Sequence, residues 1–123
     1  MSVDPIRYYE IQGQVSRIIT LCASPTVANN TQLIAAVSGQ RIRVMGLIAQ
    51  SIGAMGSFLL KSATAGTTII NTLPSPVSTA SPFVLSPGDW PLGIADTNTG
   101  EGLFVDVNTT QLVLTLQYLT YTP

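Results

Sequence analysis

Histidine is absent from the sequence, and cysteine occurs only once, at position 22. Without histidine the chain cannot form a Ser-His-Asp or Cys-His catalytic arrangement, nor a metal site with imidazole ligands. With one cysteine it cannot form an intramolecular disulfide, and we expect Cys22 to be a small buried apolar residue rather than a reactive thiol. The usual routes to hydrolysis are closed, so we predict a protein that is not an enzyme and holds no cofactor.

Charge is also scarce. Charged residues make up 9% of the 123 residues, whereas an average soluble domain has roughly 25%. The five Lys and Arg residues are scattered along the chain and the net charge is -1, so the basic patch of a nucleic-acid-binding protein is missing. Much of the surface must therefore be uncharged, and large uncharged apolar surfaces usually contact other proteins. We predict protein partners and no nucleic acid.

Four acidic residues in the C-terminal third are the remaining candidates for chemistry: Asp89, Asp96, Glu101 and Asp106. Two carboxylates can act as acid and base, and several can bind calcium. Neither a calcium-loop spacing nor a glycosidase context surrounds them. We interpret them as solvated loop charges and predict no catalytic residue and no metal.

Trp90 is the only tryptophan, and it lies between Asp89 and Pro91. A tryptophan in such a loop either closes one end of a fold as an apolar plug or stacks on a sugar ring. The plug is the preferred interpretation, and glycan contact through Trp90 is the alternative.

Residues 44–60 carry no charge and are flanked by Arg43 and Lys61, which superficially suggests a membrane span. The segment is short for that purpose and contains Gln50 and Ser51. We predict two strands around a Gly-rich turn instead, and no membrane partner. The N-terminus lacks the basic start and apolar core of a signal peptide, so we expect synthesis in the cytoplasm.

Strand-like runs separated by turn residues recur along the whole chain, and no segment keeps the apolar spacing of an amphipathic helix. We therefore predict one all-β domain over residues 1–123, with about eight to nine strands. The expected strands are residues 6–11, 14–21, 32–37, 41–50, 56–62, 67–73, 82–85, 103–107 and 111–121.

Turn residues are expected to separate these strands at 24–30, 38–40, 64–67 and 107–111. Residues 73–87 contain four prolines, so this segment should be a loop or a sheet edge. Short strands with one long connection favour a two-sheet antiparallel β-sandwich of jelly-roll or immunoglobulin-like type. A closed barrel is the alternative.

Two strands place apolar residues on both faces, although a half-buried strand should alternate. In strand 41–50 we expect Ile42, Val44 and Ile48 to face the core. The second apolar set, which needs other cover, consists of Met45, Leu47, Val113, Leu119 and Tyr121. Self-association, for example as a homotrimer, would supply that cover. The alternative is that bulges at Gly46 or Gly13 turn these residues into the same core.

The first 25 residues are a possible N-terminal arm or edge hairpin. Ile6, Tyr8, Tyr9 and Ile11 are apolar or aromatic residues interspersed with charged ones. An edge strand of this kind can pair with a neighbouring subunit through backbone hydrogen bonds. We count these four residues among the candidates for a subunit or capsid interface, with an ordinary first hairpin as the alternative.

Four segments and a Leu-rich last strand carry a resemblance to a known class. The segments are RIRVMG at 41–46, GSFLLKS at 56–62, GDWPL at 88–92 and GEGLFVDV at 100–107. Residues 40–121 resemble the small β-sandwich structural proteins of tailed bacteriophages, most of all the capsid cement (decoration) proteins.

The resemblance implies a virion protein, made in the host cytoplasm, that forms trimers on the capsid surface. Such trimers bind the major capsid protein and bridge its neighbouring subunits against the pressure of the packaged DNA. One alternative is a tail, collar or fibre component whose β-sandwich binds a host glycan. A cellular sugar-binding module is a second alternative.

Overall fold

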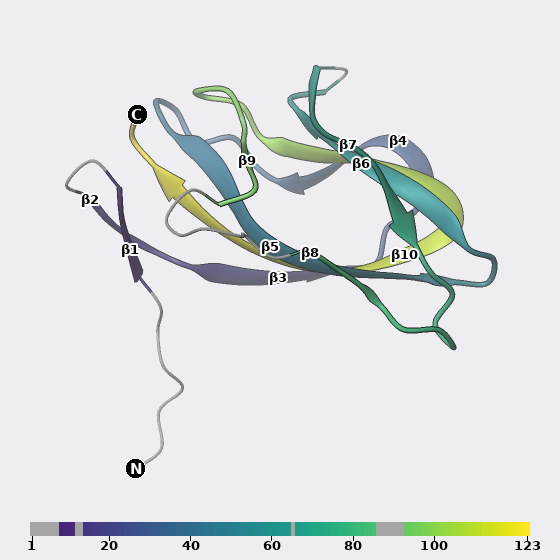
Figure 1. The fold of residues 1–123 in the computed structure, drawn as a ribbon. Helices are drawn as coiled ribbons and strands as arrows, with labels where there is room; N and C mark the ends of the chain where they lie inside the picture. The colour runs from purple at the N-terminus through teal and green to yellow at the C-terminus, as the bar shows by residue number, and fades with distance from the viewer. Residues whose placement is uncertain (1–7, 12–13, 65, 86–92) are drawn as a thin grey trace, which may run out of the picture.

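The computed structural model describes residues 8–11, 14–64, 66–85 and 93–123 (Figure 1). The regular secondary structure of these residues is entirely β, which confirms the all-β prediction. The strands are β1 (Tyr8–Ile11), β2 (Gln14–Arg17), β3 (Ile19–Ala23), β4 (Thr26–Ile34), β5 (Arg41–Ile52), β6 (Gly56–Ser62), β7 (Thr67–Ser75), β8 (Phe83–Leu85), β9 (Ala95–Asp96) and β10 (Leu103–Tyr121).

Strands β3 to β10 form one antiparallel sheet that curls strongly, with β10 through its middle (Figure 1). The first half of β10 pairs with β4 on one side and β6 on the other. Its second half pairs with β3 and β5 on the same two sides. Beyond these, β7 extends the sheet from β6, and β8 and β9 extend it from β5.

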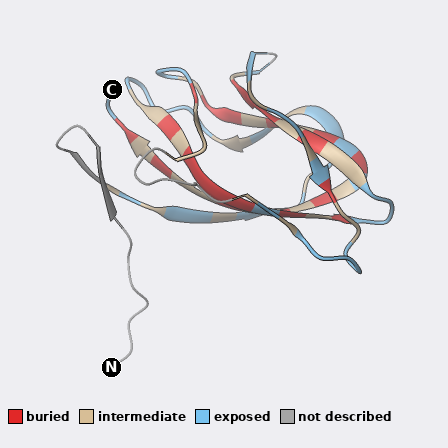
Figure 2. Cartoon of the chain, in the orientation of Figure 1, coloured by how far each residue is buried: buried red, intermediate tan, exposed pale blue. Residues whose placement is uncertain are grey.

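The curl brings the inner faces of the two halves onto one hydrophobic core, drawn red along β5, β6 and β10 in Figure 2. Burying such side chains contributes about 1.5–3 kcal/mol each. The buried members are Ile42, Val44, Leu47, Ala49, Phe58, Leu60, Leu103, Val105, Val107, Leu112, Leu114 and Leu116.

A β-bulge lies in β5 at Met45. Gly46 is opposite Gln117 on β10, but the next pair is Val44 with Tyr118, so Met45 has no Cα partner on β10. An extra residue of this kind reverses the alternation of side chains beyond it.

Because of the bulge, the residues of β5 that face the core differ from those expected. Leu47 and Val44 both lie in the main core. They are three positions apart, whereas residues on one face of a regular strand are an even number of positions apart. Ile48 is 44% exposed, so the expectation that it faces the core is wrong. A bulge near Gly46 was the alternative to an intermolecular contact, and it places Leu47 in the core of its own chain.

Two predicted turns are strand. β10 continues without interruption through residues 107–111, and β4 begins at Thr26 inside the segment 24–30. Within β4, Asn30 still has the left-handed backbone conformation that is common in turns, with φ of 59°. The turn at 38–40 is confirmed, with Gly39 at φ of 73°.

Residues 44–60 form most of β5, a turn and the first part of β6, as predicted. In the described part of the chain, no helix is long and apolar enough to cross a membrane.

The N-terminal strands β1 and β2 form a separate two-stranded sheet that extends beyond the end of β3 (Figure 1). Tyr8 is opposite Arg17 and Ile11 is opposite Gln14. Ile6 lies outside the described residues, and for Tyr8, Tyr9 and Ile11 only the backbone is described. The backbone of this region is a hairpin.

Candidate interaction surface

A polar cluster joins β5, β9 and the end of β10. Asp96 accepts hydrogen bonds at Oδ1 from Arg43 Nε at 2.7 Å, and at Oδ2 from Arg43 Nη2 at 2.9 Å and from the Tyr121 hydroxyl at 2.5 Å. The guanidinium carbon of Arg43 also lies 4.8 Å from the centre of the Tyr121 ring, which adds a cation–π attraction. The cluster fixes the two-residue strand β9 to the sheet.

The contacts within this cluster favour the charged forms of Arg43 and Asp96. Burial disfavours the charged form of Asp96, but hydrogen bonds from Arg43 and Tyr121 outweigh it, so the pKa of Asp96 lies below its ordinary value. The hydrogen bond to Asp96 raises the pKa of Arg43. Burial, followed by the hydrogen bond to Asp96, raises the pKa of Tyr121. A carboxylate held ionised in this way supports the fold and is poorly suited to act as a general acid.

Three of the predicted interface residues are buried against the same end of the sheet. Met45, Leu119 and Tyr121 are 2%, 0% and 4% exposed and form a small second core, with Ile18 packed against it. Gly93 lies so near that a Cβ on it would be 3.1 Å from Met45 Sδ. The chain therefore supplies cover for these three side chains itself.

The other acidic residues whose side chains the structure describes also have partners. Asp106 Oδ1 lies 3.0 Å from Lys61 Nζ and accepts a hydrogen bond from the Asn30 backbone at 2.7 Å. Glu101 accepts a hydrogen bond from Ser62 Oγ at 2.6 Å, which lowers its pKa.

The interpretation of the acidic residues as solvated loop charges is wrong for two of them, because Asp96 and Asp106 are strand residues in ion pairs. Asp89 and Trp90 lie outside the described residues. Among residues 8–11, 14–64, 66–85 and 93–123, no three His, Cys, Asp or Glu side chains are grouped so as to hold a metal ion.

Away from the polar cluster, one face of the sheet carries no charge. Val84, Ile48, Thr115 and Cys22 are successive partners across β8, β5, β10 and β3. Partners in adjacent strands point to the same side of a sheet. With the neighbouring rows they form what we call the outer face, which consists of Thr20, Cys22, Gly46, Ile48, Gln50, Val84, Val113, Thr115 and Gln117.

The outer face combines apolar and uncharged polar side chains. Ile48 is 44% and Val84 is 55% exposed. Val113, a predicted interface residue, is half-buried on this face. Cys22 is exposed, so the expectation that it is buried is wrong.

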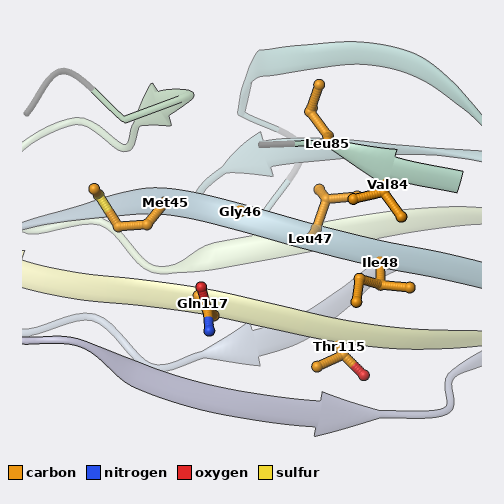
Figure 3. Close-up of a pocket in the computed structure, with 8 residues that line it drawn as sticks. All are labelled: Met45, Gly46, Leu47, Ile48, Val84, Leu85, Thr115 and Gln117. Carbon is orange, nitrogen blue, oxygen red and sulfur yellow. The ribbon is translucent and has the colours of Figure 1, made fainter. Parts of the chain in front are cut away.

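A shallow pocket of about 170 Å³ opens on the outer face around the bulge. Figure 3 shows Ile48 of β5 next to Thr115 of β10, with Val84 of β8 on the other side of Ile48. The pocket is smaller than the roughly 300–1,000 Å³ of typical ligand sites. It is large enough for a side chain of another protein.

Sequence reasoning missed most of the outer face. Its apolar members come from three strands and are diluted by Thr and Gln, so no single segment stands out. The available signal was the lack of charge in residues 18–40 and 44–60, which together supply β3 and most of β5. No family model, curated protein or solved structure matches this chain.

Proposed function

We propose that the chain is a structural protein of a tailed-bacteriophage virion that docks on the outside of the capsid and stabilises contacts between major capsid subunits, as cement proteins do. The observation that carries the proposal is the uncharged outer face, on which Ile48 and Val84 are exposed. Burying a charged side chain in a contact is costly unless it is paired. A sheet face without charges avoids that cost and is suited to a flat contact with another protein.

The remaining chemistry of the described residues supports a binding role over a catalytic one. Asp96, Glu101 and Asp106 are all engaged by groups of the fold. The outer-face pocket is shallow and lacks a charged group, whereas enzyme sites usually combine a larger pocket with titratable residues of perturbed pKa.

The choice of the capsid as partner rests on the resemblance to cement proteins, which is carried by residues 41–46, 56–62, 88–92 and 100–107 and by the Leu-rich last strand. Within this proposal, the two halves of the curled sheet correspond to the two layers of a jelly-roll or immunoglobulin-like sandwich. They share one core, as the layers of a sandwich do.

Cosedimentation tests the proposal. The purified protein is mixed with capsids of the encoding phage that were assembled without it, and bound protein is measured over a concentration series. Saturable binding, together with a higher temperature of capsid disruption, is expected. Binding to isolated tails or host glycans but not to capsids would overturn the capsid role and favour the tail, collar or fibre alternative.

A further inference from the structure

The open edges of the curled sheet differ in how well they are protected. Unpaired strand edges attract other strands, so proteins usually shorten them, bulge them or place proline or charges on them. β8 has three residues and β9 two. β7 carries Pro74, and β4 is interrupted by Asn30 and by register shifts against β10.

β3 has none of these protections. It pairs with β10 in unbroken register from Ile19 to Ala23, and no strand in the described part of the chain pairs with its other edge. In an antiparallel strand, alternate residues direct their backbone N–H and C=O groups to opposite sides. Among the residues that the structure describes, the open side of β3 therefore presents backbone donors and acceptors without a strand partner. The sequence has no charged residue from 18 to 40, and Figure 2 shows β3 largely exposed.

We infer that β3 pairs antiparallel with β3 of a second copy of this chain, so that one sheet continues through two molecules. The open backbone groups require an extended strand as the occupant. An identical strand meets that requirement without electrostatic conflict, because neither copy brings a charge to the contact and like charges opposite one another would be unfavourable. The contact is self-complementary around the middle of β3, as two-fold symmetry demands.

The pairing also doubles the surface described above. Thr20 and Cys22 belong to the outer face, so two copies joined at β3 present their outer faces side by side. The contact has two-fold symmetry and yields a dimer, whereas the resemblance to cement proteins implies a trimer. The inference of a dimer is argued from the open edge of β3 alone and does not depend on capsid binding.

The single cysteine provides a specific test. With the two-fold axis at Leu21, the two Cys22 side chains are diagonal neighbours about 7–8 Å apart. A short bismaleimide should then convert most of the wild-type protein to a covalent dimer on a denaturing gel. Cys22→Ser should give none. A matched control, Thr99→Cys in the Cys22→Ser background, moves the thiol to an exposed turn, and it should run as a monomer on the denaturing gel after the same treatment. Equal cross-linking from positions 22 and 99 would overturn the inference.

A second variant tests the edge without cross-linking. Thr20→Lys with Cys22→Lys places lysines opposite one another across the proposed pair. Light scattering should give this double variant half the molar mass of the wild type, and its far-ultraviolet circular dichroism spectrum should be unchanged. Thr79→Lys with Thr99→Lys adds the same charge at exposed positions away from β3 and should keep the wild-type mass. A monomeric wild type, a trimer, or equal masses for the two variants would contradict the β3 contact.

Discussion

The guanidinium of Arg43 donates two hydrogen bonds to the carboxylate of Asp96, from Nε to Oδ1 at 2.7 Å and from Nη2 to Oδ2 at 2.9 Å. The two residues are Cα partners across β5 and β9. Two-pronged pairs of this kind are among the stronger charged hydrogen bonds in proteins. The short strand β9 is thereby held to the sheet by side chains as well as by its backbone.

Asp96→Asn should destabilise the protein at neutral pH and make its stability less sensitive to acid. Because the folded pKa of Asp96 lies below its ordinary value, the pair stabilises the fold above about pH 4 and loses this contribution as the pH falls through the folded pKa. We expect a loss of about 2 kcal/mol at pH 7, measured by urea unfolding. The difference from wild type should shrink steadily on acidification below about pH 4. A difference independent of pH would contradict this role of Asp96.

Leu47→Ala and Ile48→Ala should differ sharply in cost although the residues are adjacent. Leu47 is 2% exposed in the main core, and Ile48 is 44% exposed on the outer face. We expect Leu47→Ala to lower the free energy of unfolding by about 3 kcal/mol and Ile48→Ala by less than about 1 kcal/mol. Chemical denaturation measures both. A larger loss for Ile48→Ala than for Leu47→Ala would contradict the assignment of Leu47 to the core and of Ile48 to the outer face.

Thr97→Val should leave a buried backbone donor without its partner. Thr97 is fully buried, and its Oγ1 accepts a hydrogen bond from the Ile42 backbone N–H at 2.9 Å. Valine has nearly the same shape but cannot accept, so we expect a loss of about 2 kcal/mol. The exposed Thr99→Val is the control, with a change within about 0.5 kcal/mol. Comparable thermal unfolding of the two variants would show that this hydrogen bond contributes little.

Much of the strand pattern could be predicted from sequence. Residues 56–62 form β6 with the expected bounds, and the strand expected from residue 41 does begin at Arg41. The failure at 107–111 has a physical cause. Asn and Thr favour turns locally, but Thr109 is buried and donates a hydrogen bond to the Ala54 carbonyl. Pairing on both sides of β10 overrides the local preference.

The faces of β5 and the outer face could not be predicted, because one inserted residue decides them. Up to Val44 the core-facing residues are even-numbered, and from Leu47 onward they are odd-numbered. No local signal in the sequence fixes whether the chain bulges at Met45 or turns Leu47 outward. That choice follows from pairing with β10, more than sixty residues away along the chain.

The most direct test of docking through the outer face compares Ile48→Glu with Met55→Glu in the capsid cosedimentation experiment. Both side chains are exposed, at 44% and 72%, so both variants should fold. Only Ile48 lies on the outer face, since Met55 is in the turn between β5 and β6. A charge buried at the contact should weaken binding at least about tenfold, so Ile48→Glu should stay in the supernatant while Met55→Glu sediments like wild type. Equal sedimentation of the two variants would contradict docking through the outer face.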